Sequence, residues 1–133
     1  MKHHLTATLA VLGILAGTAH AGATDDLLAR YKSEGAGEFS AERGAAMWTR
    51  SVLNPTTGKE MSCATCHRQD LRQPGKHEKT GKVIEPLAPS VNPKRLTDAA
   101  FIEKWFTRNC KGTWGRACTP QEKGDFLLYI GKQ

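Results

Sequence analysis

Two cysteines and a histidine stand close together at Cys63, Cys66 and His67, in the order C-x-x-C-H. On one turn of helix, cysteines three positions apart can reach the two vinyl groups of one porphyrin, and the adjacent histidine can ligate its iron. A zinc site would need a second, similarly spaced pair of ligands, and a thioredoxin-like redox pair would need a βαβ unit. The sequence shows neither, so it predicts one covalently attached haem c with its iron.

The other two of the four cysteines, Cys110 and Cys118, belong to no second C-x-x-C-H motif. In an oxidising compartment we expect them to form a disulfide that closes a short segment, worth about 2–3 kcal/mol in the loop-entropy model. Free thiols and a bridge to another chain are the alternatives.

The sixth ligand of the iron would decide what such a protein does. Electron-carrier cytochromes c take a methionine from the stretch that follows the haem motif. Here no methionine follows His67, since Met47 and Met61 both precede the motif. A histidine–methionine electron carrier is therefore disfavoured.

The remaining donors for that position are few. His77 is the only other histidine after the first 21 residues, but its loop would have to cross to the far side of the ring. A lysine would first have to lose a proton from a reference pKa of about 10.4. Asn109 follows an expected helix and directly precedes Cys110, so it is either a ligand or an ordinary helix-ending asparagine. The residues alone leave all three open.

The first 21 residues have the pattern of a targeting segment. Lys2 gives a basic start, Leu5 to Gly17 is apolar, and Ala19-His20-Ala21 is an A-x-A cleavage site. The apolar run is shorter than the roughly 20 residues that a spanning helix needs. We expect a signal peptide over 1–21, cleaved after Ala21, and a soluble periplasmic monohaem domain over 22–133 with no membrane span.

Length and charge exclude several classes of protein. The chain has 133 residues, 39% of them hydrophobic, which suits one small domain and excludes a Rossmann enzyme with a substrate domain. Its net charge is +6, and the densest basic stretch runs from Arg68 to Lys82. That stretch is either a solvated loop or a docking surface for an acidic partner protein. Basic and aromatic residues do not alternate, so nucleic acid is not expected as a partner.

Four helical segments and a long loop are expected along the chain. No segment has a convincing strand pattern, and residues 54–93 are broken by prolines and glycines, so the predicted fold is small and all-α. The helices are expected over residues 25–33, over 41–52 after a cap at Ser40, over 98–108 after a cap at Thr97, and from Pro120 onward after a cap at Thr119 with Glu122 at the third helical position.

Several segments resemble the oxygen-binding SHP-type (sphaeroides haem protein) cytochromes c. They are the haem motif, residues 81–90, the run Glu103-Lys104-Trp105-Phe106-Thr107-Arg108-Asn109-Cys110, and residues 115–119 and 122–126. The resemblance spans most of 38–131 and implies a class I-like cytochrome c fold around one covalently bound haem. It further implies His67 as proximal ligand, the Asn109 side chain as distal ligand of ferric iron, and a Cys110–Cys118 disulfide beside it.

The same resemblance extends to the packing. Gly44 and Trp48, on an early helix, resemble one side of a crossing between two helices. Phe126 and Tyr129, on the last helix, resemble the other side. Pro86 resembles the proline whose carbonyl accepts the Nδ1 proton of the proximal histidine, although an ordinary loop proline is the alternative.

A function follows from the chemistry of the implied ligands. An amide oxygen is a hard, weak donor that suits Fe(III) better than Fe(II), so reduction should release Asn109 and let O₂, NO or CO bind. The resemblance implies a dihaem or multihaem cytochrome as electron donor. The alternatives are a plain electron-transfer cytochrome with a permanent sixth ligand and a terminal oxidase or reductase of the bound ligand. No acid–base pair stands beside Asn109, so ligand binding and electron transfer are favoured over an enzyme.

Overall fold

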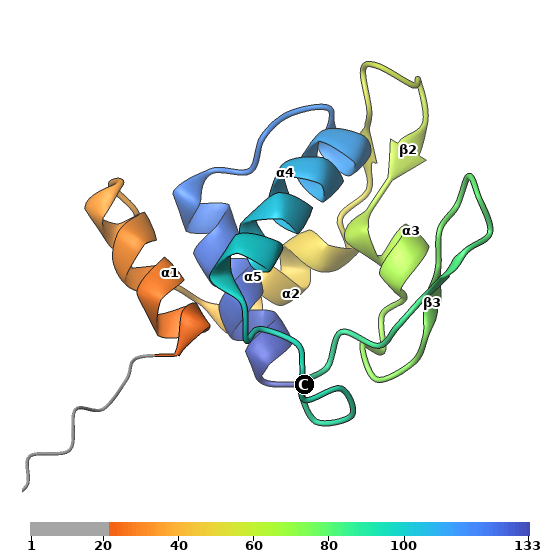
Figure 1. Ribbon diagram of the computed structural model, residues 1–133. Coiled ribbons are helices and arrows are strands. Elements are labelled where there is room, and N and C mark those ends of the chain that lie inside the picture. Colours follow the sequence, from red (N-terminus) through yellow and green to blue (C-terminus); the bar gives the residue numbers. More distant parts are fainter. Residues whose placement is uncertain (1–21) are drawn as a thin grey trace, which may run out of the picture.

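The computed structural model describes residues 22–133, in which the longer helices pack against one another and two short hairpins lie at one edge of the molecule (Figure 1). The predicted signal peptide over 1–21 lies outside the described residues. The helices are α1 (Ala23–Ser33), α2 (Ala41–Thr49), α3 (Cys63–His67), α4 (Ala99–Trp114) and α5 (Pro120–Gly131). The strands β1 (Val52–Leu53) and β2 (Glu60–Met61) form one antiparallel pair, and β3 (Gly75–Lys76) and β4 (Val83–Ile84) form the other.

The start and the end of α4 differ from the sequence-based expectation. Asp98, not Thr97, is the N-cap, and its side chain accepts a hydrogen bond from the backbone N–H of Phe101 at 2.9 Å. The helix continues past Arg108 to Trp114 and ends where Gly115 adopts the left-handed conformation, with φ of +70°. A glycine tolerates that conformation without a steric penalty, which explains why the helix stops there.

The start of α2 follows the prediction, but its end does not. The Ser40 side chain accepts from the backbone N–H of Arg43 at 3.2 Å, as a cap should. The helix ends at Thr49, and Val52, expected to lie in it, belongs to β1. The expectation of no strands was also wrong, since two-residue strands are too short for any alternation of polar and apolar residues to reveal them.

The predicted crossing of an early helix with the last helix is confirmed between α2 and α5. A Cβ on Gly44 would stand 2.2 Å from the backbone oxygen of Asp125, so only glycine allows this approach. One turn further along α2, the Trp48 ring lies 6.0 Å from Phe126 and 5.7 Å from Tyr129, between ring centroids.

The crossing is also held together by a buried carboxylate. Asp125 is only 2% exposed and accepts hydrogen bonds from the Ser40 backbone N–H at 2.7 Å and from Arg43 Nε at 2.8 Å. These bonds tie the first turn of α2 to the middle of α5. The N-terminus of α5 follows the prediction, with a reciprocal capping box between Thr119 and Glu122.

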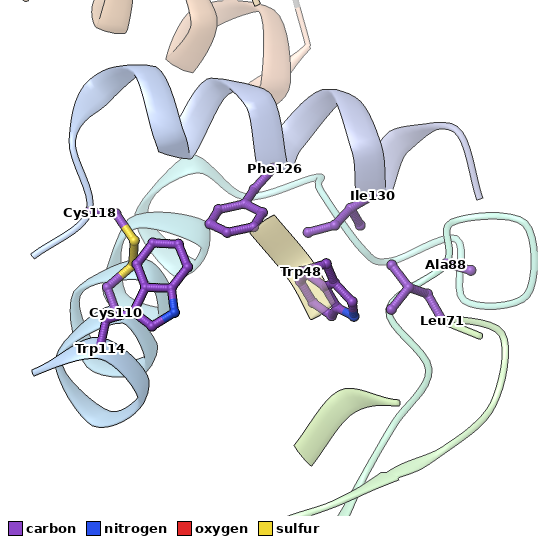
Figure 2. Packing of buried hydrophobic residues seen from close by; sticks show 8 residues of the cluster. All are labelled: Trp48, Leu71, Ala88, Cys110, Trp114, Cys118, Phe126 and Ile130. Atoms are coloured by element: carbon purple, nitrogen blue, oxygen red, sulfur yellow. A yellow bond between two sulfur atoms is a disulfide. The ribbon is translucent and has the colours of Figure 1, made fainter. Parts of the chain in front are cut away.

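One hydrophobic cluster fills the space beneath α5. Figure 2 shows the Trp48 ring near Phe126 and Ile130, with the Cys110–Cys118 pair beside Trp114. The other members come from the long middle segment, and its path is fixed because the Leu71 carbonyl accepts from the backbone N–H groups of both Leu87 and Ala88. The complete cluster is Trp48, Leu71, Ala88, Cys110, Trp114, Cys118, Phe126 and Ile130.

Helix α1 packs on the other side of α4 and α5. Leu27 and Tyr31 form a second buried cluster with Ile102 and Leu127. The Tyr31 hydroxyl donates to Glu103, which also pairs with Lys123 at 2.9 Å. Across residues 22–133, each helix is too short or too polar to span a bilayer.

Replacing Gly44 with alanine tests the crossing. The added methyl group has to push α5 away from α2, and such overpacking costs about 1–3 kcal/mol of the free energy of unfolding. Denaturant titration of the holoprotein measures the change. Gly112→Ala is the matched control, because a Cβ there has no neighbour within 4 Å and alanine is the better helix former. Equal unfolding free energies for the two variants would contradict the close crossing.

Candidate functional site

Helix α3 consists of the five residues of the C-x-x-C-H motif. Cys63 and Cys66 lie one helical turn apart, half-buried and not bonded to each other. Burial raises the pKa of the Cys63 thiol to about 12, so it stays protonated at neutral pH. Thr65 Oγ1 accepts from the Ser62 backbone N–H at 3.0 Å and fixes the start of the helix. Two thiols that are not paired with each other therefore stand on one turn, as covalent attachment to a porphyrin requires.

The His67 imidazole is neutral, and the Trp48 ring packs beside it. Burial, and then the charge of Arg95, lower the pKa of His67 to about 4, so its ring carries no charge at neutral pH, which is the form that binds metals. The Trp48 ring lies 5.7 Å from it, and Trp48 Nε1 donates to the Arg68 backbone oxygen at 2.8 Å. The tryptophan of the α2–α5 crossing therefore also positions the end of α3.

Pro86 does not meet His67 in the way that the resemblance suggested. The Pro86 carbonyl accepts from Arg95 Nε at 2.9 Å and from Asn92 Nδ2 at 3.1 Å. His67 Nδ1 is buried, and it has no hydrogen-bond partner within residues 22–133. The carbonyl expected to orient the imidazole is taken by two other donors.

The β3–β4 hairpin lies against α3. A Cβ on Gly75 would stand 2.2 Å from the Cys66 carbonyl oxygen and 3.1 Å from the His67 Cα, so the strand passes directly over the motif. His77 follows on this hairpin, exposed to solvent, and its Nδ1 accepts from the Thr80 backbone N–H at 3.2 Å. His77, one candidate for the sixth ligand, therefore lies on the hairpin that packs against α3, the helix that contains His67.

Asn109 lies inside α4 rather than at its end. Five further helical residues follow it, so the alternative reading as a helix-ending asparagine is wrong. Its side chain is exposed and makes no hydrogen bond to any described residue. An amide in the middle of a helix that caps nothing is available for another task.

The haem motif and the segment that follows Asn109 pack against the same hydrophobic cluster. Cys63 and Ala64 pack against the buried cluster to which Cys110 and Trp114 belong. Buried Asn54 adds a polar link, because its Nδ2 donates to the Gly112 carbonyl at 2.8 Å. The β1–β2 hairpin, which leads into the motif, is therefore tied to the last turns of α4.

Cys110 and Cys118 are paired in the structure, with Cα atoms 5.6 Å apart (Figure 2). Cys110 directly follows Asn109 in α4, and Cys118 directly precedes the cap of α5. Both are buried in the main cluster. The pairing joins α4, next to Asn109, to the start of the last helix.

The donor set fits a haem c. Two unpaired thiols stand on one helical turn, a neutral imidazole follows them, and its Nδ1 is the buried ring nitrogen, which leaves Nε2 for the metal. Comparisons with known proteins agree. Cytochrome c-type protein SHP of Cereibacter sphaeroides is 43% identical over 133 residues, covering 97% of this chain and 100% of that protein. Cytochrome c'' of Methylophilus methylotrophus is 42% identical over 87 residues, covering 65% of this chain and 60% of that protein.

Solved structures give the same result. The structure of oxidized SHP, described as an oxygen-binding cytochrome c, has a TM-score of 0.75 at 41% identity and covers 84% of this chain and 98% of that one. Oxidized cytochrome c'' from Methylophilus methylotrophus has a TM-score of 0.71 at 35% identity, over 84% and 94%.

The all-α fold and these relatives define a c-type cytochrome with a covalently attached haem c and its iron. Residues 34–130 match the family described as "Domain of unknown function (DUF1924)". The chain belongs to this family, and within the c-type cytochromes it is a member of the SHP type.

Three residues that shape the site were not singled out from the sequence as doing so. Asn54 had a visible signal, because Asn-Pro marks a turn, but nothing showed that its side chain reaches α4. Gly75 and Arg95 act through contacts that depend on how a loop folds back on the residues before it. Contacts of this kind leave no local pattern in one sequence.

Gly75→Ala tests how the hairpin is seated on α3. The new methyl group would overlap the Cys66 carbonyl, so the hairpin has to move away, at a cost of about 1–3 kcal/mol. Limited proteolysis should cut residues 75–84 faster, and denaturant titration should show the loss. Lys76→Ala, at an exposed neighbouring position, is the control and should stay within about 0.5 kcal/mol of the wild type. Unchanged proteolysis in Gly75→Ala would refute the contact.

Proposed function

We propose that this chain is an exported monohaem cytochrome that accepts an electron and binds a diatomic gas when reduced. Cys63 and Cys66 hold the haem through thioethers, His67 is the proximal ligand, and Asn109 is the distal ligand of the ferric form. The haem supplies a one-electron couple at iron and a coordination position for O₂, NO or CO. The position of Asn109, unbonded in the interior of α4 and next to Cys110, is the observation that carries the proposal.

Asn109 is suited to leave when the iron is reduced. Its amide oxygen is neutral and hard, so it binds Fe(III) better than Fe(II). Its backbone stays in place in both states, because α4 continues beyond it and Cys110 is joined to Cys118. A side-chain rotation is then enough to open the distal position, and the freed amide can hydrogen-bond to the incoming ligand.

The relatives support gas binding as the function. SHP is described as an oxygen-binding cytochrome c, and a second structure of cytochrome c'' is described as giving insights into haem-ligand detachment. A plain electron carrier with a permanent ligand is the alternative. His77 is the first candidate for that ligand, but its hairpin is packed on α3, on the proximal side. A terminal oxidase or reductase acting on the bound ligand is a third reading.

Electrons would come from a partner cytochrome, for example a dihaem one, docked through basic residues. Lys76, Lys79 and Lys82 are exposed on the β3–β4 hairpin, next to α3. Their charge would attract an acidic partner to the side of the protein where the haem is attached. The compartment would be the periplasm, with residues 1–21 removed as a signal peptide and 22–133 forming the monohaem domain.

Absorption spectra of the holoprotein test this function. The oxidised form should be low-spin and six-coordinate, and the dithionite-reduced form should be high-spin and should change sharply on adding CO. Asn109→Ala should be high-spin already when oxidised and should bind CO when reduced as the wild type does. Alanine is the better helix former at this exposed position, so the variant should still fold.

Two controls separate the candidate ligands. His77→Ala and Thr107→Ala should both leave the oxidised spectrum unchanged, because neither side chain is proposed to reach the iron. An Asn109→Ala protein that remains low-spin and six-coordinate when oxidised would overturn the ligand assignment. A reduced wild type that ignores CO would instead show a permanent ligand and an electron-transfer function.

The pairing of Cys110 with Cys118 predicts a stability effect in the oxidised protein. Changing both to alanine removes a cross-link worth about 2–3 kcal/mol of the free energy of unfolding in the loop-entropy model. Denaturant titration measures the loss. Thiol alkylation followed by mass spectrometry is the control, since the folded or unfolded wild type should take up no label at either cysteine before reduction. Labelling without a reductant would contradict the disulfide.

A further inference from the structure

The face of α4 that presents Asn109 has a bulky side chain at one end and a position without a side chain at the other. At about 3.6 residues per turn, Trp105 lies one turn before Asn109 and Gly112 just under one turn after it, on the same face. Trp105 is 39% exposed, and Gly112 is exposed as well. Thr113, the other residue one turn after Asn109, is rotated toward the buried side of the helix and is half-buried. The surroundings of the proposed distal ligand are therefore uneven.

Neither the backbone nor the packing among residues 22–133 requires a glycine at position 112. Gly112 lies in the interior of α4, and it is not one of the glycines with a positive φ. A Cβ there would meet no described atom within 4 Å, in contrast to Gly44 and Gly75. A glycine in a helix interior weakens the helix relative to alanine. Part of that loss is offset by Asn54, whose Nδ2 donates to the Gly112 carbonyl at 2.8 Å.

We propose that Gly112 leaves the space in which the diatomic ligand is held once Asn109 has left the iron, and that Trp105 closes the other end of this space. The inference rests on the proposed role of Asn109 as distal ligand. Asn109 can reach the iron only where this face of α4 lies over the porphyrin. Residues one turn before and after it, about 5.4 Å away along the helix, then lie over the porphyrin as well.

The Trp105 ring is held in place by its neighbours on α4. Phe101 packs against it edge-on, with ring centroids 6.0 Å apart. Lys104 Nζ lies 5.9 Å and Arg108 Cζ 5.7 Å from the centroid of the ring, close enough for cation–π attraction. A space bounded by a fixed indole and by bare helix backbone admits a ligand of two atoms and excludes a bulky one. Access of this kind decides which ligands a haem iron can bind.

Substitutions that add volume at Gly112 without changing the charge test the proposal. In the dithionite-reduced holoprotein, Gly112→Leu should slow the association of CO after flash photolysis by about tenfold or more, because the side chain occupies the space of the ligand. Gly112→Ala should slow it less. The infrared C–O stretching band should also move in Gly112→Leu. Leucine is a better helix former than glycine, and a Cβ at this position meets no described atom, so the variant should fold.

Thr107→Leu is the matched control. Thr107 is also exposed on α4, but it lies two positions from Asn109 and therefore on nearly the opposite side of the helix. This variant should match the wild type in CO association rate and in band position. Trp105→Ala tests the other end of the space and should bind n-butyl isocyanide more tightly than the wild type does. Equal affinities would overturn the role of Trp105.

The oxidised spectra separate the possible results. Gly112→Leu should remain low-spin and six-coordinate when oxidised, because Asn109 is unchanged. A high-spin spectrum would show that the glycine serves a close approach of the haem, which overturns the inference. If the wild type binds CO and Gly112→Leu binds it as fast as Thr107→Leu does, the inference fails and the proposed function stands. A reduced wild type that ignores CO overturns the proposed function and the inference together.

Discussion

The close approach of α2 to α5 at Gly44 determines where the rest of the site can be. Since nothing larger than a hydrogen atom fits between Gly44 and the Asp125 backbone, Trp48 enters the cluster at a fixed depth. From there its ring packs near His67, and its indole N–H holds the carbonyl that ends α3. The haem-attachment helix is only five residues long and could not be stable alone. Its position therefore depends on the packing of this crossing.

The segment that carries Asn109, the proposed distal ligand, depends on the same cluster, but by another route. Helix α4 contributes Cys110 and Trp114 to this cluster, and exposed residues lie between the two. Asn109 is thus carried by a helix that is anchored by the buried Cys110, the next residue, and by Trp114, while its own side chain is exposed. A ligand that must come and go is best placed on a backbone that does not move, because only one side chain then pays the entropy of ordering.

Local sequence signals predicted the helices well and their contacts poorly. The cap at Ser40 and the capping box at Thr119 were readable because capping depends on residues within one turn. The end of α4 was placed too early, since Asn109 and Gly112 weaken a helix pattern and only the buried Cys110 and Trp114 show why the helix continues. The haem motif was identified from spacing alone. The engagement of Pro86 by Arg95 could not be, because it depends on how a loop closes in space.

The segment between the haem motif and α4 connects the two sides of the site. It leaves the Pro86 carbonyl at Arg95, turns at Leu96 and enters α4 at Ala99. Leu96 has a φ of +60°, a left-handed conformation that costs an ordinary residue about 1–2 kcal/mol. Its side chain packs against both hydrophobic clusters, which offsets that cost and makes the turn rigid. The side chains that hold the Pro86 carbonyl and the helix that carries the proposed distal ligand are therefore parts of one continuous stretch of chain.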